Sequence, residues 1–255
     1  MEEANTLCCP DGTRVPILEE WQQFFRGEFE TRYVFYRKEK DIFYTKDLRG
    51  AGEDLEHYGD IINKNEIYTA YESTMLQFQT SDQDFDFIKR PPLNLYTPGA
   101  TDARDCFAQE LSVYERMRQN PHPGICKYKG CIVVDGYVEG IVLERYRCTL
   151  YEAVEESLSF DAVKVMDTIT DAVAHLHSLE LVHNDLSPHN ILFDDDLNPV
   201  IADMETCMPE GCPPILKMGS PAWSGNWKSS ALANDEIALK RIRLYLNGLY
   251  DPPKQ

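Results

Sequence analysis

The sequence lacks any apolar run long enough to cross a membrane. A membrane-spanning helix needs roughly 18 uninterrupted apolar residues, and none of the 255 residues lies in such a stretch. The segment Met1–Asn5 is acidic, and no apolar stretch typical of a signal peptide follows it. We therefore expect an intracellular protein of the cytoplasm or nucleus, with no membrane span.

The sequence also lacks Cys-x-x-Cys pairs and is poor in basic residues. The spacing of its eight cysteines argues against structural zinc and favours reduced thiols. It has 25 Lys and Arg against 43 Asp and Glu, a formal net charge of −18. Nucleic-acid phosphates would be repelled, so we expect no nucleic-acid partner. A basic substrate or partner would be attracted, although a solvated acidic surface gives the same count.

Residues 1–64 carry no chemical motif but are rich in aromatic residues. The residues Trp21, Phe24, Phe25, Phe29 and Tyr33 recur at offsets that place them on one face of a helix. This spacing predicts a helical N-terminal extension that packs on the rest of the protein. A helix that binds a partner or a second copy is the alternative.

The next part of the chain is predicted to be mostly strands with one helix. Alternation over 85–89 is typical of a strand. A helical period follows from Asp102, a plausible N-cap, and it ends before Pro121. Strand-like runs at 131–134 and 141–143 are separated by Asp135-Gly136, which favours a hairpin turn.

The second half is predicted to be mainly helical. A buried helix is indicated over Ala162–His177, with Asp161 or Ser159 as its cap. Two short strands, Ile191–Phe193 and Val200–Ala202, are expected to pair as a hairpin. A last helix is expected over Asp235–Asn247, where Gly248 ends it.

A polar loop precedes that hairpin, over His183–Asn190. Pairing of the two strands returns the chain so that Asp203 emerges beside Asn190 and Asp185. Two carboxylates and an amide oxygen then converge, and such hard oxygen ligands suit Mg²⁺. Asp185 could instead orient or deprotonate an attacking hydroxyl.

This combination resembles the protein kinase superfamily. His183-Asn184-Asp185-Leu-x-x-x-Asn190 is similar to the catalytic loop H-R-D-L-x-x-x-N, and Asp203-Met204-Glu205 stands in the place of D-F-G. The likeness extends over roughly residues 65–247 and is greatest to small fungal (ascomycete-type) kinase-like proteins with a His-Asn-Asp loop and a truncated C-lobe. It implies an α+β, bilobal fold, with a strand-rich N-lobe at 65–146 that has one helix and a shortened helical C-lobe at 147–250.

The resemblance implies ATP and Mg²⁺ as cofactors and assigns residues to bind the nucleotide. Lys89, in Phe87-Ile88-Lys89, resembles the strand lysine that holds the α and β phosphates. Glu110 resembles its ion-pair partner on the helix. Glu144 and Tyr146 would belong to the hinge whose backbone meets the adenine.

The same resemblance assigns the catalytic end of the site. Asp185 would be the catalytic residue that receives the hydroxyl proton, with Lys89 and Asn190 completing the catalytic set. Asn190 and Asp203 would bind the metal, and Asp235 resembles the aspartate that braces the loop.

The sequence departs from the family at several positions. No glycine occurs between Ile67 and Lys89, so the glycine-rich loop is missing. Residues 72–74 are a candidate replacement, although the glutamate at 72 would repel phosphates. Glu205 replaces the glycine of D-F-G, as an extra metal ligand or on a different loop path. Ser187 replaces a lysine and removes a positive charge from the transferring phosphate. Asn184 replaces the arginine that pairs with an activation-loop phosphate.

Three functions are compatible with these residues. The first is an ATP- and Mg²⁺-dependent phosphotransferase that acts on the hydroxyl of an unidentified protein substrate. The second is a pseudokinase that binds a partner without catalysis, as the missing glycines suggest. The third is a small-molecule kinase of the aminoglycoside or choline type, which the short connection after the hinge disfavours.

Overall fold

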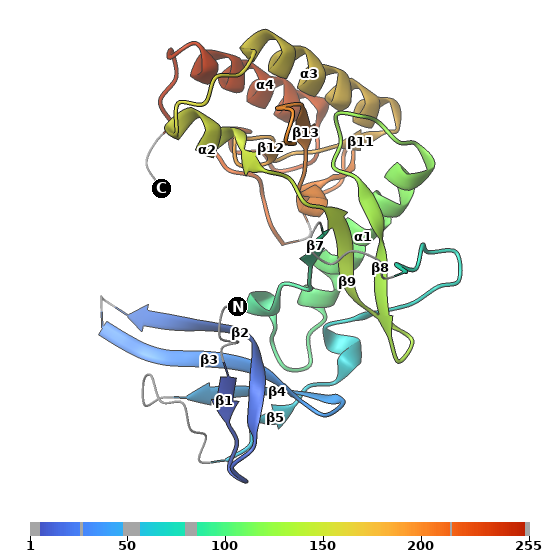
Figure 1. Ribbon diagram of the computed structural model, residues 1–255, viewed down its shortest axis with the longest axis vertical. Coiled ribbons are helices and arrows are strands. Elements are labelled where there is room, and N and C mark those ends of the chain that lie inside the picture. Colours follow the sequence, from blue (N-terminus) through green and yellow to red (C-terminus); the bar gives the residue numbers. More distant parts are fainter. Residues whose placement is uncertain (1–5, 26–27, 48–56, 80–85, 215, 253–255) are drawn as a thin grey trace. The chain divides into compact units, whose positions relative to one another are not determined.

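The computed structural model in Figure 1 describes residues 6–25, 28–47, 57–79, 86–214 and 216–252. The chain divides into two compact units. Unit 1 comprises Met1–Tyr68 and Pro91–Asp105, and unit 2 comprises Thr69–Arg90 and Cys106–Gln255. Among the described residues, no helix combines the length and apolar character that a membrane span requires.

Unit 1 is built on a five-stranded antiparallel sheet whose strands neighbour one another in chain order. The strands are β1 (Thr6–Cys8), β2 (Arg14–Phe25), β3 (Glu28–Lys38), β4 (Asp41–Asp47) and β5 (Asp60–Ile61). Short 3-10 turns lie at Lys64–Glu66 and Leu93–Leu95. A small apolar cluster that includes Leu7, Val15 and Val34 is buried against the sheet.

The prediction of a helix over residues 21–33, made from the aromatic spacing, is wrong. The chain forms β2 and β3 there, and Trp21 is the register partner of Tyr33. The two positions, twelve apart in the chain, are paired in the register of two antiparallel strands. Aromatic residues have a high strand propensity, which the helical interpretation neglected.

The sheet of unit 2 has β9 (Tyr137–Glu144) at its centre. β8 (Tyr128–Val134) pairs with one edge of β9, while β6 (Thr69–Ala70) and β7 (Asp86–Lys89) pair with the other. The predicted turn between β8 and β9 is present, with positive φ at Asp135 (52°) and Gly136 (81°), as a type I′ hairpin turn requires.

Helix α1 (Asp102–Gln119) packs its predicted apolar face into the core of unit 2. The other helices are α2 (Leu150–Glu155), α3 (Ala162–Ser178) and α4 (Leu232–Leu246). The predicted cap of α3 is confirmed, since the Asp161 side chain accepts hydrogen bonds from the backbone N–H groups of Val163 and Lys164.

Figure 1 shows α3 and α4 side by side above the predicted hairpin, whose strands are β12 (Ile191–Phe193) and β13 (Pro199–Ile201). Short strands complete this part of unit 2: β10 (Cys148–Thr149) pairs with β12, and β11 (Leu181–Val182) pairs with β14 (Met208–Pro209). A 3-10 turn lies at Met204–Thr206. Helix α4 begins three residues earlier than expected, so Asp235 lies in its first turn.

The buried position of β9 predicts a contrast between two isoleucines on paired strands. Ile141 of β9 has no exposed surface, whereas Ile88 of β7 is 40% exposed. We expect Ile141→Ala to lower the free energy of unfolding by about 2–5 kcal/mol, because it leaves a cavity in the core. Ile88→Ala, the matched control, should cost less than about 1 kcal/mol. Urea unfolding of both variants measures these changes. Equal losses of unfolding free energy would contradict the difference in burial between Ile141 and Ile88.

Candidate functional site

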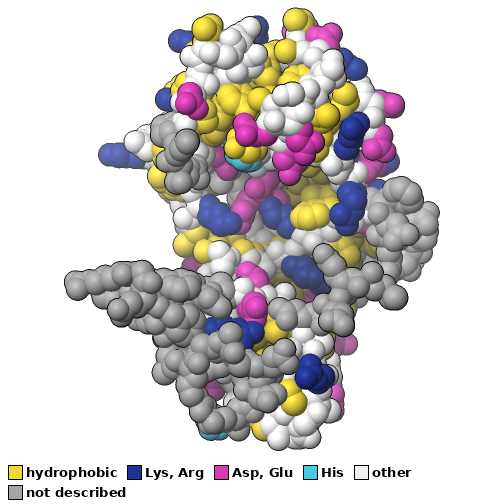
Figure 2. Space-filling view, turned by 60° about the vertical axis from the view of Figure 1, so that its left-hand side comes forward, with side chains coloured by type: hydrophobic (Ala, Val, Ile, Leu, Met, Phe, Trp, Pro, Cys, Tyr) yellow, Lys and Arg dark blue, Asp and Glu magenta, His cyan; other side chains and the backbone are white. Residues whose placement is uncertain are grey.

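A cavity of about 450 Å³ lies in unit 2 between the sheet and the polar loop. Its wall includes five of the residues singled out in the sequence, namely Lys89, Glu144, Tyr146, Asn190 and Asp203. Glu110 lies behind Lys89, and Asp185 lines a neighbouring cavity. The space-filling view in Figure 2 shows acidic and basic side chains close together on one face of unit 2.

Lys89 joins three elements through two carboxylates. Its Nζ lies 2.8 Å from Glu110 Oε1 on α1 and 2.6 Å from Asp203 Oδ1, just after β13. Glu110 is buried, and Asp203 borders the cavity. The contact between Lys89 and Glu110 therefore exists as expected, and Asp203 is a second partner that the spacing alone did not indicate.

The charges of this trio depend on one another. Burial lowers the pKa of Lys89, but Glu110 and Asp203 raise it by more, so that it lies above its usual value. Burial raises the pKa of Asp203, but Lys89 and smaller contributions lower it by more in total, so the pKa lies below its usual value. For Glu110 burial dominates and raises the pKa to about 7. Lys89 is therefore cationic and Asp203 anionic at neutral pH.

Asp185 is held from two sides. Its Oδ1 accepts a hydrogen bond of 2.7 Å from the backbone N–H of Ser220, and its Oδ2 accepts one of 3.2 Å from Asn190 Nδ2. The same amide nitrogen donates to the backbone carbonyl of Asp185 at 2.8 Å. Both contacts use the amide nitrogen, so the amide oxygen of Asn190 remains as the group able to bind a cation. Burial raises the pKa of Asp185.

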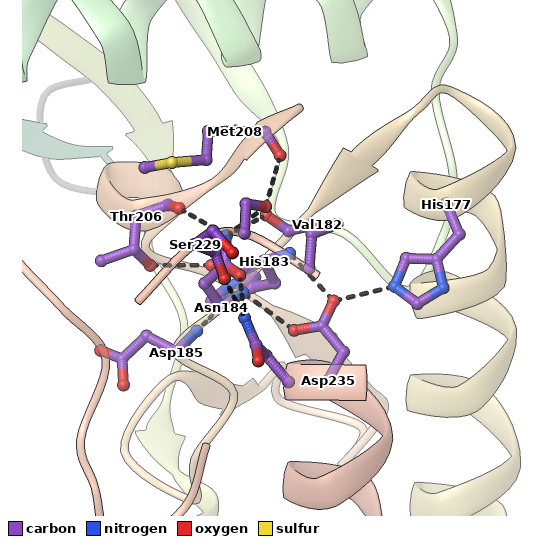
Figure 3. Close-up of polar contacts among 11 residues, drawn as sticks. His177, Val182, His183, Asn184, Asp185, Thr206, Met208, Ser229 and Asp235 are labelled. Carbon is purple, nitrogen blue, oxygen red and sulfur yellow. Dashed lines mark hydrogen bonds and ion pairs between the residues drawn. The ribbon is translucent and has the colours of Figure 1, made fainter. Parts of the chain in front are cut away.

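Asp235 anchors the start of the loop from below, as Figure 3 shows. Its carboxylate is fully buried and accepts hydrogen bonds from the backbone N–H groups of His183 (2.9 Å) and Asn184 (2.8 Å). His177 of α3 also contacts it, with Nε2 at 2.9 Å. A single carboxylate thus fixes the loop to α4 and α3.

Asn184, in the place of the expected arginine, is a buried structural residue. Its backbone has a left-handed φ of 66°, which asparagine tolerates better than most residues. Its amide nitrogen donates to Val182 O, Thr206 O and Ser230 Oγ, each at 3.0 Å. Its side-chain oxygen accepts from Asn234 at 2.8 Å. The substitution replaces a charge with a neutral hydrogen-bonding network.

Two residues, distant in the sequence, contact this region but were not identified in the sequence analysis. Gly219 approaches so closely that an added Cβ would lie 2.1 Å from the carbonyl oxygen of Asn184. Only glycine fits there, and it places the N–H of Ser220 against Asp185. The second is Lys217, which lies 2.8 Å from Glu205. The carboxylate at the glycine position of D-F-G is therefore paired with a lysine.

The segment expected to replace the glycine-rich loop lies elsewhere. Thr74 O accepts a hydrogen bond from Arg118 of α1, and the N–H of Leu76 donates to Glu115 of α1. The N–H of Phe78 donates to Cys131 O on β8. None of these residues lines the cavity. The expectation that 72–74 covers the phosphates is therefore wrong, because α1 and β8 bind this segment.

The described part of the chain contains no cluster of three or more His, Cys, Asp or Glu side chains placed to hold a metal ion. Asn190 and Asp203 nevertheless line the same cavity and offer oxygen ligands. A pair of oxygen ligands suits Mg²⁺, which takes its other ligands from water and phosphates. Their role as metal ligands stays a prediction.

Comparison with known proteins relates this region to protein kinases. Residues 96–208, which include Glu110, Asp185, Asn190 and Asp203, match the protein kinase domain family. The serine/threonine-protein kinase PrkC of Bacillus subtilis is 30% identical over 117 residues, which are 46% of this chain and 17% of that protein.

Two fungal proteins are also similar. The sensor for unfolded proteins in the ER ire1 of Schizosaccharomyces pombe is 33% identical over 95 residues, or 34% of this chain and 9% of that protein. The fatty acyl-CoA synthetase and RNA processing-associated kinase 1 of Saccharomyces cerevisiae is 28% identical over 132 residues, or 49% of this chain and 15% of that protein. The chain thus spans less than a fifth of each of these three relatives.

The anchoring by Asp235 predicts a large stability loss on its removal. Asp235→Ala leaves two buried backbone N–H groups without their acceptor, at about 1–3 kcal/mol each. We expect Asp235→Ala to lower the free energy of unfolding several times more than Asp167→Ala does. Asp167 is an exposed control on α3. Chemical denaturation measures both, and a similar loss in the two variants would show that the loop does not depend on Asp235.

Proposed function

We propose that this protein is an ATP- and Mg²⁺-dependent phosphotransferase of the protein kinase type, which transfers the γ-phosphate to a protein hydroxyl. The contact of Lys89 with both Glu110 and Asp203 carries this proposal. It joins the cation needed for phosphate binding to a carboxylate that borders the same cavity as Asn190. Residues 65–146 and 147–250 are proposed as the two lobes, with 1–64 as an extension.

The cavity suits a nucleotide in size and in the groups along its wall. Its volume of about 450 Å³ lies within the range of small-molecule sites, roughly 300–1,000 Å³. Glu144 and Tyr146 border it at the end of β9. The backbone N–H of Tyr146 has no backbone partner among the described residues and is free to meet an adenine nitrogen.

Each charged group then has one task. Lys89 binds phosphate oxygens and is held in place by Glu110. Asp203 and Asn190 hold Mg²⁺, which neutralises the charge that develops on the phosphates. Asp185 orients the acceptor hydroxyl and accepts its proton, while Ser220 keeps the carboxylate in position.

A pseudokinase is the alternative, and one observation favours it. The segment around Thr74 and Leu76 is bound to α1, so the described residues provide no glycine-rich cover for the phosphates. A pure binding module, however, has no need of a carboxylate held in place at Asp185. Assays of ATP binding and of phosphate transfer separate the two functions.

The metal assignment predicts a Mg²⁺-dependent effect of ATP on thermal stability. ATP with Mg²⁺ should raise the midpoint temperature of thermal unfolding, since a ligand at a hundredfold excess over its Kd stabilises the folded state by about 2.7 kcal/mol. Asp203→Asn should lose the Mg²⁺-dependent part of this shift. Asp195→Asn, an exposed control in the turn after β12, should keep it. An unchanged shift in Asp203→Asn would refute the assignment.

Asp185→Asn should abolish transfer and leave the protein folded, with the loss of the hydrogen bond from Asn190 Nδ2 to Asp185 Oδ2. The asparagine oxygen can still accept from Ser220, so ATP binding should persist. Burial raises the pKa of Asp185, so the folded state holds its proton more tightly than the unfolded state. This group therefore destabilises the native protein increasingly as pH rises above about 4, the unfolded pKa. The variant should gain stability over the native protein in that direction.

Radiolabelled phosphate transfer and urea unfolding across a pH series check these expectations. Residual transfer at the native rate would remove Asp185 from its proposed role. A variant that loses stability relative to the native protein as pH rises would contradict the sign of its pKa shift.

A further inference from the structure

The cavity of about 450 Å³ that contains Lys89 and Asp203 is called the nucleotide cavity below. A second cavity of about 650 Å³ adjoins it in unit 2. His189 and Asn190 line both cavities, and Asp185 lines the second. The acceptor hydroxyl must approach Asp185 from this side if the proposed function holds. The chemistry of this second wall, called the acceptor cavity below, therefore bears on which acceptors are used.

The acceptor cavity has carboxylates and aromatic rings but no cation. Its other lining residues include Tyr151, Glu155, Trp223, Tyr245 and Asp251, and no lysine or arginine is among the described residues that line it. The nucleotide cavity differs, because it is lined by three cations, Lys89, Arg145 and Arg147, as well as by three carboxylates. Cations able to bind phosphate therefore line the nucleotide cavity, whereas the charged lysine and arginine groups are missing from the described wall of the acceptor cavity.

Two of the carboxylates in the acceptor cavity are unused by the protein. Neither the carboxylate of Glu155 nor that of Asp251 has an ion-pair or hydrogen-bond partner among the described residues. The hydroxyl oxygen of Tyr245 is buried and likewise has no hydrogen-bond partner in the described part of the chain. The wall thus offers acceptor groups for a ligand beside aromatic faces.

Packing holds the aromatic side of the wall in place. Trp223 packs edge-on against Tyr245, with ring centroids 5.5 Å apart. Arg241 donates to the carbonyl oxygens of residues 221–223, which fixes the turn that carries Trp223. On the opposite element, Tyr151 of α2 stacks on His189 at 4.2 Å. Because Glu155 follows Tyr151 by four positions, both lie on one face of α2.

Ser187 stands in the wall of the acceptor cavity at a position where a cation would be expected. It lines the acceptor cavity and is buried, at the position where the sequence resemblance expects a lysine. A lysine there would place a positive charge next to the phosphate during transfer. In this chain the charge is missing, and the surrounding carboxylates would bind one brought from outside.

We propose that the acceptor is a peptide segment with a basic side chain next to its hydroxyl residue, and that this cation occupies the acceptor cavity. The inference rests on the proposed function. Glu155 and Asp251 attract the cation, and the faces of Tyr151 and Trp223 contact it. The volume exceeds that of one side chain, which favours a peptide over a small amine.

The substrate then supplies the positive charge that Ser187 does not. During transfer a bond forms between the acceptor oxygen and the γ-phosphorus, and the bond from that phosphorus to the departing ADP oxygen breaks. The hydroxyl proton passes to Asp185. The bound basic side chain lies beside the transferring phosphate and offsets its charge.

The test compares peptides that carry serine, threonine or tyrosine flanked by arginine with the same peptides flanked by citrulline, its neutral near-isostere. We expect kcat/KM to be at least about tenfold higher with arginine, equivalent to about 1.4 kcal/mol. Glu155→Gln and Asp251→Asn should each reduce this preference. Glu156→Gln, an exposed neighbour outside the cavity, should leave it unchanged.

A second pair of variants tests the role of position 187. Ser187→Lys should raise transfer to the citrulline peptides and reduce the arginine preference, whereas Ser187→Met, of similar length and no charge, should do neither. Thermal melting identifies any variant that fails to fold, in which case the Glu155→Gln result decides.

Equal rates with both sets of peptides would overturn this inference and leave the proposed function intact. Transfer to an amino alcohol or aminoglycoside but to no peptide would overturn the peptide class. Transfer to no acceptor, with Mg²⁺-ATP still bound, would overturn the proposed function and this inference together.

Discussion

The buried carboxylate of Asp235 is the contact on which the geometry of the site depends. A polar loop inside a protein must find partners for its backbone N–H groups, and Asp235 serves those of His183 and Asn184 together. His177 and the Asn184 network hold the same region from other elements. The path of the loop is thereby fixed before it reaches Asp185, so the proposed catalytic carboxylate is positioned by a residue that lines neither cavity.

The sequence predicted those parts of the fold that arise from local spacing. The hairpin pairs Ile191 with Ile201, as the two apolar runs indicated, and Asp161 caps α3. The meeting of Lys89 and Glu110 was expected from the motif order rather than from local physics, and the side chains are in contact. The N-terminal sheet was missed because Trp21 and Tyr33, twelve positions apart, fit a helix face as well as a cross-strand pair.

Contacts between distant segments that belong to no motif could not be predicted. No pattern near Leu76 indicates that its N–H will donate to Glu115, 39 positions later. The contact of Ser220 with Asp185 spans 35 positions, and its one visible signal is Gly219, where a close backbone approach excludes a side chain. A glycine between polar residues is common in loops, so this signal became specific only with the fold known. The same holds for Lys217, whose contact with Glu205 spans 12 positions.

The ion pair between Lys89 and Asp203 has a consequence for how ligands bind. Under the proposed function, phosphate oxygens would compete with Asp203 for Lys89, and a metal ion would compete with Lys89 for Asp203. ATP alone would leave Asp203, whose side chain is half-buried, facing added negative charge, while Mg²⁺ alone would leave Lys89 facing a second cation. When both bind, each ligand takes one partner of the broken pair, and both charges regain a counter-charge. The proposed function therefore implies that nucleotide and metal bind with positive coupling, and such coupling is reciprocal. The ion pair between Lys89 and Asp203 is the contact that would carry it.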